Sequence, residues 1–321
     1  MKTRTEIQFK EEIFRTGYHQ PILMLGSCFT DNIGKKLQNY LFNVSVNPFG
    51  VIYNPLSIKN ALDALLQKDA YTRNDLDFHD ELWFSFDHYT KFSDPSPEKV
   101  LENINAEFAK ARSVLNDAGT LILTFGTAFV YTHQEQGRVV NNCHKIPASA
   151  FQRKMLSVEE IVSEMAPLLD KLRSAHPKLK ILFTVSPVRH TKDGLAENQR
   201  SKATLLLAIR EIIHSDPKKC GYFPAYEIMT DDLRDYRYYA ADLVHPNDQA
   251  IDYIWELFRK NCLDKEANEA IDKLEPVLRG LQHRPLHFGT EKYRKFRSQL
   301  EDKTRKLKNE YPFLNWDQIP L

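Results

Sequence analysis

The feature that most constrains the fold is the repeated succession of a short, continuous apolar run and a segment with helical periodicity. The first run, residues 22–25, ends at Gly26, and apolar residues then recur every four positions over residues 29–41. Two further runs, at 120–125 and 180–185, also precede helical patterns. Such runs are typical of strands buried on both faces, and the helices are long enough to cross over a sheet. We therefore predict an α/β protein, a three-layer α/β/α sandwich with a parallel sheet.

Three other segments complete the expected organisation. Residues 46–55 contain two prolines, each of which removes a ladder donor, so a shaped loop is predicted there. A Tyr- and Phe-rich strand is expected at 222–229, before the last crossover helix. Toward the end of the chain the composition shifts to Lys, Glu, Arg and Asn. We expect an α/β domain over residues 1–262 and a helical C-terminal extension over 263–321.

Composition argues against several classes of function. Lys+Arg 44 against Asp+Glu 43 gives a net charge of +1, so no global field attracts nucleic acid or an anionic membrane. No apolar run reaches about 18 residues, and the N-terminus lacks the apolar core of a signal peptide, so we expect a cytoplasmic protein without membrane insertion. The four cysteines form no CxxC pair, and no ligand pair has zinc-site spacing. We expect reduced thiols, no metal and no cofactor.

Asp242 and His245 form a candidate catalytic pair. Ligands of an open parallel sheet bind at the carboxyl ends of its strands, and this pair directly precedes the last predicted helix. An Asp three residues before a His on a turn can hold Nδ1 and leave Nε2 as a general base. The alternative is that Asp242 caps the helix and His245 only packs.

Cys28 is the candidate nucleophile. It follows the first strand at the start of a helix, where the field of the helix N-terminus favours a thiolate. The alternative is a small buried cysteine in a strand-to-helix turn. Ser27 lies beside it and either attacks in its place or bonds backbone amides of the turn.

These segments resemble the GSCFA family, which is similar to the SGNH and GDSL hydrolases and acyltransferases. The resemblance rests on LGSCFT at 25–30, NPFG at 47–50 and ADLVHP at 241–246, and it spans about residues 21–258. It implies a flavodoxin-like fold of the SGNH type and activity as an esterase or acyltransferase.

A gapless match to the SGNH motifs places Cys28 at the nucleophile and Ser27 at the adjacent Asp. Asp242 and His245 match the D-x-x-H block, and Gly50 matches the block whose glycine amide helps to form an oxyanion hole. SGNH enzymes use a serine. The resemblance therefore implies cysteine chemistry, or a one-residue shift of the nucleophile to Ser27, or a loss of acyl transfer.

The third SGNH block, usually G-x-N-D, reads GTAF at 126–129, so the Asn that completes the oxyanion hole is absent. Losing one such donor typically costs about a hundred- to a thousandfold in rate, so a replacement is expected. Its candidates lie in loops predicted at the same rim: Asn47, Thr127, Asn142 and His144. Gly126 belongs to the same predicted site. Arg189, after the third strand, is a candidate for binding a carboxylate or phosphate, with a surface ion pair as the alternative.

The residues and the resemblance together predict an esterase or acyltransferase that acts on a small-molecule or carbohydrate ester. The expected nucleophile is Cys28 or Ser27, and the expected base is His245, oriented by Asp242. Hydrolysis and transfer to a hydroxyl acceptor are both compatible with a thioester intermediate. The alternative, from another class, is a non-catalytic protein that keeps the fold and binds a carbohydrate or an acyl group.

Overall fold

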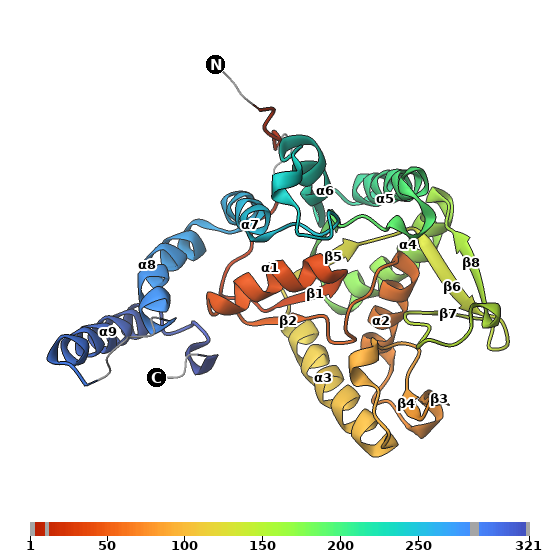
Figure 1. Cartoon of the computed structure of the whole chain (residues 1–321), viewed down its shortest axis with the longest axis horizontal. Helices are drawn as coiled ribbons and strands as arrows, with labels where there is room; N and C mark the ends of the chain where they lie inside the picture. Colours follow the sequence, from red (N-terminus) through yellow and green to blue (C-terminus); the bar gives the residue numbers. More distant parts are fainter. Residues whose placement is uncertain (1–3, 10–12, 283–288, 319–321) are drawn as a thin grey trace.

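The computed structural model describes residues 4–9, 13–282 and 289–318, and its centre is a five-stranded parallel sheet (Figure 1). The strand order is β10-β9-β5-β1-β2, and each neighbouring pair is parallel. The strands are β1 (Ile22–Gly26), β2 (Val44–Val46), β5 (Thr120–Phe125), β9 (Lys180–Val185) and β10 (Cys220–Phe223). The predicted parallel sheet is confirmed, and its apolar runs at 22–25, 120–125 and 180–185 are all strands.

Alternate residues of each strand face two separate hydrophobic layers. Leu23 and Leu25 pack in one cluster, whereas Ile22 and Met24 pack in the other. The first cluster is covered by α2 (Pro55–Gln67), α3 (Pro97–Asp117), α4 (Val158–Ala175) and α5 (Leu195–Ser215). The second is covered by α1 (Cys28–Asn39) and α7 (Asp248–Cys262). The strands are predominantly apolar because both faces of the sheet are buried, which confirms the three-layer sandwich.

Two antiparallel sheets accompany the central one. The larger has the order β7-β6-β8, built from β6 (Phe129–His133), β7 (Arg138–Val140) and β8 (Phe151–Met155). The smaller is the hairpin of β3 (Asp77–His79) and β4 (Leu82–Phe84), which contacts α3. Both sheets lie on the right of Figure 1, on the side away from the two C-terminal helices.

The prediction of a strand over residues 222–229 is wrong beyond residue 223. β10 ends at Phe223, and the chain continues as the short helix α6 (Ala225–Glu227) and a π-helix at Ile228–Asp232. The residue between β10 and α6 is Pro224, which has no N–H to extend the ladder of β10. The apolar residues that suggested a longer strand are buried instead by the helical turns.

The C-terminal extension is helical, as predicted. α8 (Lys265–Gln282) and α9 (Glu291–Glu310) reach away from the sheet in Figure 1. Leu274 of α8 and Leu300 of α9 nevertheless belong to the same hydrophobic cluster as α1 and α7. The extension is therefore anchored through a shared core. In the described part of the chain, no helix combines the length and the apolar character that crossing a bilayer requires.

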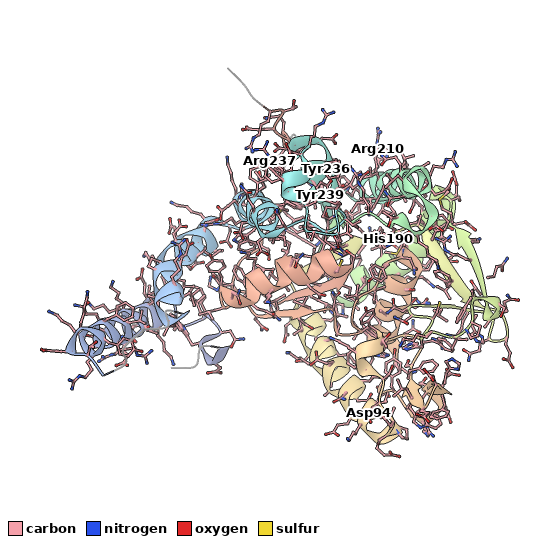
Figure 2. The ribbon with its side chains drawn as sticks, viewed as in Figure 1. Asp94, His190, Arg210, Tyr236, Arg237 and Tyr239 are labelled. Carbon is pink, nitrogen blue, oxygen red and sulfur yellow. The ribbon has the colours of Figure 1, made fainter. Side chains whose placement is uncertain are left out.

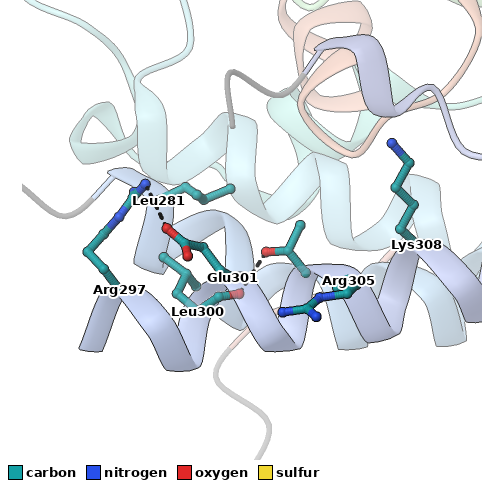
Figure 3. Close-up of a pocket in the computed structure, with 7 residues that line it drawn as sticks. Leu281, Arg297, Leu300, Glu301, Arg305 and Lys308 are labelled. Carbon is teal, nitrogen blue, oxygen red and sulfur yellow. Dashed lines mark hydrogen bonds and ion pairs between the residues drawn. The ribbon is translucent and has the colours of Figure 1, made fainter. Parts of the chain in front are cut away.

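A pocket lies between the two helices of the extension (Figure 3). It is lined by Leu281 of α8 and by residues of α9 that include Leu300, Glu301 and three basic side chains. Arg297 pairs with Glu301 at 3.5 Å across one end of it. The lining residues that the structure describes include neither a cysteine nor a histidine, so the candidate acyl-transfer groups lie elsewhere.

Candidate active site

A pocket of about 380 Å³ opens at the carboxyl ends of β1, β5 and β9. This is the edge at which ligands of open parallel sheets bind. The lining residues whose side chains can react, ionise or hydrogen-bond include Cys28, Tyr53, Thr127, Arg189, His190 and His245. His190, which follows β9, is labelled in Figure 2 at this edge. The fold thus brings Cys28 and His245 to one pocket from distant parts of the sequence.

The turn between β1 and α1 separates the roles of Ser27 and Cys28. Gly26 has a φ of +153°, and a Cβ there would lie 2.4 Å from the carbonyl oxygen of Thr124, so only glycine fits. Ser27 is 1% exposed and is the N-cap of α1, where its Oγ accepts from the Phe29 amide at 3.4 Å. Cys28 is the first helical residue and lines the pocket.

The electrostatic environment of Cys28 differs from the expectation. Burial raises the pKa of its thiol, and the nearby carboxylate of Asp31 raises it further. The backbone amides of Cys28 and Phe29 and the ammonium of Lys202 act in the opposite direction without reversing the shift. The backbone amides at the start of α1 therefore favour the thiolate, as predicted, but the burial of the thiol has the larger effect on its pKa. Cys28 is a protonated thiol at neutral pH and needs a base.

The loop before α7 holds Asp242 against His245. Nδ1 of His245 lies 2.6 Å from Oδ2 of Asp242, and Oδ1 accepts from the amides of Val244 and His245 at 2.9 Å. The His245 amide, then the Val244 amide, then the imidazole lower the pKa of Asp242 to about 2. An ionised Asp242 keeps the proton of His245 on Nδ1 and leaves Nε2 as the acceptor. Both side chains are half exposed, at 49% and 51%.

Cys28 and His245 share the pocket without a direct hydrogen bond. The proposed chemistry requires their sulfur and imidazole to approach within hydrogen-bonding reach, and the contacts among the described residues contain no bond between them. Cys28 is partly buried at the start of a helix, and His245 lies on an exposed loop. Catalytic hydrogen bonds are often long in unliganded enzymes and shorten with substrate.

Asn47 and Gly50 hold the shaped loop in place. Oδ1 of Asn47 accepts from the Gly26 amide at 2.8 Å, and its Nδ2 donates to Asp31 at 2.6 Å. The amide of Gly50 donates to the Asn47 carbonyl at 2.7 Å. Gly50 has a φ of +77°, and a Cβ there would lie 2.3 Å from Tyr89. The donors expected from both residues are therefore occupied within the protein, and neither residue is among those that line the pocket.

The same loop, residues 46–55, is hydrogen-bonded to the residues that follow β5. The carbonyl of Tyr53 accepts from the amides of Gly126 at 2.7 Å and Thr127 at 2.9 Å. The Thr127 hydroxyl lies 3.1 Å from Oγ of Ser201 and still lines the pocket. Of the residues proposed to replace the missing Asn, Thr127 is thus the one that the structure places at the pocket.

Asn142 and His144 lie in a separate aromatic cluster. Oδ1 of Asn142 accepts from the His144 amide at 2.8 Å. The His144 ring stacks on Phe84 with centroids 4.1 Å apart, and its Nε2 lies 3.1 Å from the Ser85 carbonyl. Burial lowers the pKa of His144 to about 4, so it is neutral at pH 7. Neither Asn142 nor His144 is among the described pocket residues, because their loop turns back onto β4.

Several residues at or beneath the pocket were not among the predicted site residues, and they include Tyr53, Phe129, Tyr131, His190 and Lys202. Tyr53 lay inside the proline-bounded loop, where no pattern separates a pocket residue from a packing one. Lys202 did leave a signal, because it shares one face of its helix with Leu205, Ile209 and Ile212, and all of these are buried. A lysine on the apolar stripe of a helix indicates a buried, bonded ammonium.

Solved structures that are similar to this chain include carbohydrate esterases. An acetyl xylan esterase (Est2A) from Butyrivibrio proteoclasticus matches at 11% identity and a TM-score of 0.37, covering 76% of this chain and 64% of that one. A family 3 carbohydrate esterase from Talaromyces cellulolyticus matches at 9% identity and a TM-score of 0.35, covering 79% of this chain and 99% of its own. The chain therefore spans less than two thirds of the first esterase and almost all of the second.

The sequence comparisons agree with the motifs. A search of curated proteins gives no significant match. The model of the GSCFA family matches residues 21–258, and that of the GSCFA domain protein, C-terminal domain, matches residues 274–319. The first match includes β1 to β10, Cys28, Asp242 and His245. Since it covers most of the chain, this protein belongs to the GSCFA family.

Proposed function

We propose that this protein is an esterase or acyltransferase with Cys28 as its nucleophile. The observation that carries the proposal is that Cys28 and His245 line one pocket while Asp242 holds Nδ1 of His245. Ser27 is less suited to attack a substrate, because its side chain is buried and caps α1. A weakly acidic thiol in one pocket with an oriented imidazole matches the requirements of general-base-assisted nucleophilic catalysis.

The reaction starts when Nε2 of His245 accepts the thiol proton of Cys28 and the sulfur attacks the ester carbonyl. The C–O bond then breaks, the alcohol leaves with the proton from His245, and a thioester remains on Cys28. Water or a hydroxyl acceptor next attacks the thioester carbonyl while His245 removes the proton of that acceptor. The C–S bond then breaks, the acid or the new ester leaves, and His245 returns the proton to the sulfur. Asp242 stays ionised and stabilises the imidazolium that forms in both halves.

The oxyanion needs donors that replace those of the SGNH pattern. The Cys28 amide acts on the sulfur and supplies the first, whereas the Phe29 amide already donates to Oγ of Ser27. The Gly50 amide is occupied by Asn47, so two pocket hydroxyls take its place and that of the missing Asn: those of Tyr53 and Thr127. Burial, with the neighbouring Cys28, raises the pKa of Tyr53 to about 12, so its hydroxyl remains a donor.

The substrate is a small-molecule or carbohydrate ester. Phe129 and Tyr131 line the pocket together with Tyr53, and such rings offer both apolar faces and polar edges to an acylated sugar. Arg189 lines the same pocket and provides a guanidinium for an anionic substituent. Transfer and hydrolysis differ only in which hydroxyl reaches the thioester.

Intact-mass measurement after incubation with an activated ester tests the proposal. We expect an acyl adduct on the wild type and on Ser27→Ala, and no adduct on Cys28→Ala. Cys28→Ser keeps a hydroxyl in place and is expected to acylate slowly. An unaltered adduct in Cys28→Ala would remove Cys28 as the nucleophile.

The second candidate function is non-catalytic binding of a carbohydrate or acyl group. It is favoured by the side chain at the third-block position, where the fully buried Ala128 offers no donor. If no adduct forms with acyl chains of several lengths while sugar or acyl ligands still bind, this function replaces the enzyme.

A further inference from the structure

Lys202 of α5 is 0% exposed and lies beneath the pocket. Its Nζ donates to the carbonyl oxygens of Gly126 and Ser186, both at 2.7 Å. These residues directly follow β5 and β9, two adjacent parallel strands, at the edge where the ladder of the sheet ends. Lys202 therefore joins the two strand ends that carry Thr127 and His190 into the pocket.

No carboxylate accompanies this buried ammonium among the described residues. Burial lowers the pKa of Lys202 to about 7, and Cys28 is the one titratable group in the described part of the chain that raises it. The ring of Tyr226 lies 5.6 Å from Nζ and contributes a π face. The two carbonyl oxygens accept two N–H hydrogen bonds, and a neutral amine could donate both of them as well. The charge of Lys202 is therefore not explained by its hydrogen bonds.

The same charge acts on two pocket residues. It lowers the pKa of Cys28 against the opposing effects of burial and Asp31. On His190, burial is the main cause and Lys202 the second, and together they lower the pKa to about 4, so that His190 is neutral. Asp193, His245 and Arg153 are the other charged or titratable groups that act on His190. Gly126, whose carbonyl accepts from Lys202, lies against the turn that carries Cys28, since a Cβ on Gly126 would be 3.4 Å from Cβ of Ser27. Cys28 is thus the acidic partner available to Lys202.

We propose that Lys202 is a positioning residue whose buried positive charge stabilises the thiolate of Cys28. The ammonium keeps its three protons, and the thiol proton passes to His245. The inference extends the proposed function, but its test does not use an ester. Since the stabilisation requires a charged Lys202, it is present below about pH 7 and is lost as the pH rises through that value.

Alkylation of Cys28 by iodoacetamide as a function of pH measures the thiolate directly. In Lys202→Met, which keeps the length of the side chain without its charge, we expect Cys28 to react about tenfold more slowly than in the wild type at pH 6, equivalent to about one pKa unit. The two rates should converge above pH 8. A difference that is zero, or that does not depend on pH, would overturn the proposal, since a structural clamp produces no such convergence.

The chain offers two controls for this experiment. Cys143 is partly exposed, and its pKa is influenced by Lys192, so its alkylation should be unaffected in Lys202→Met. Lys192→Met removes a lysine from the rim of the same pocket, and Cys28 should alkylate at the wild-type rate in this variant. Quantifying each cysteine by peptide mass spectrometry reports both sites from one reaction.

A second measurement applies even if Lys202→Met does not fold. In His245→Gln, which removes the other titrating base, the logarithm of the Cys28 alkylation rate should rise with pH, flatten near pH 7 to 8, and rise again. A straight line of unit slope would overturn the proposal. If this inflection is present but no acyl adduct forms with esters, the proposed function fails and the role of Lys202 stands. If an acyl adduct forms but the inflection is absent, the proposed function stands and the role of Lys202 fails.

Discussion

The ring of Tyr53 meets the ring of His190 edge to face, with the centroids 5.3 Å apart. Nε2 of His190 is buried and has no hydrogen-bond partner among residues 4–9, 13–282 and 289–318. Burial is the main reason why the pKa of His190 falls to about 4. His190 is therefore a neutral packing partner at pH 7, which supports our proposal of His245 as the base of the pocket. The contact also fixes the Tyr53 ring independently of its hydroxyl.

Tyr53→Phe should remove a hydroxyl while the ring keeps its contact with His190. With an activated ester, we expect kcat to fall by about a hundredfold and the stability to change little, because one oxyanion donor is lost. Steady-state kinetics and thermal unfolding check this. Tyr236→Phe, at a side chain that is 68% exposed, is the control. Wild-type kcat in Tyr53→Phe would assign the donor role to Thr127.

Asp242→Asn should lower kcat by about a hundredfold or more, since a neutral amide no longer holds the proton of His245 on Nδ1. The wild-type carboxylate has a pKa of about 2, below its usual value of 3.8. Asp242 therefore stays ionised as the pH falls until about pH 2. A pH–rate profile should show no acid limb from Asp242 between pH 4 and 8, and retention of full activity by Asp242→Asn would contradict the dyad.

Gly26→Ala should destabilise the protein by at least about 1–3 kcal/mol, because both the positive φ and the Thr124 carbonyl oppose a Cβ. Gly137→Ala is the matched control, since Gly137 also has a positive φ, +63°, but no atom lies within 4 Å of its Cβ position. Chemical denaturation should show a clearly smaller loss for Gly137→Ala. Equal losses would mean that contact with Thr124 plays no part.

The stability of the protein should fall as the pH drops below about 6.5. Burial lowers the pKa of His144 to about 4, so the unfolded chain, with an ordinary value of 6.5, binds the proton first. The contribution of His144 is present above pH 6.5 and is lost toward pH 4, on the order of 3 kcal/mol. Denaturation at pH 7 and pH 4 should show a smaller difference for His144→Gln than for the wild type. The control is His214→Gln, at an exposed side chain, which should leave the difference in stability between pH 7 and pH 4 at its wild-type size.

Local patterns in the sequence were enough to locate most of the fold. The run at 22–25 and the periodicity after it predicted β1 and α1, because four consecutive apolar residues require two covered faces. The prediction of a strand at 222–229 was wrong because the apolar residues of this segment fit a strand and a buried helix equally well. The position of each motif at a predicted strand or helix end also placed Cys28 and His245 at the same edge of the sheet, and both line one pocket.

Burial and side-chain partners depend on contacts between distant segments, so they became visible only in the folded chain. Asn47 was a candidate donor in the sequence, but in the folded chain its Nδ2 donates to Asp31 of α1 and its Oδ1 accepts from the Gly26 amide. Cys28 looked like a thiolate because its helix position is local, whereas its desolvation comes from the whole pocket. Lys202 acquires its low pKa in the same way, from the layers of protein that separate it from water. The backbone pattern is thus a property of neighbours in sequence, and the acidity of each group is a property of neighbours in space.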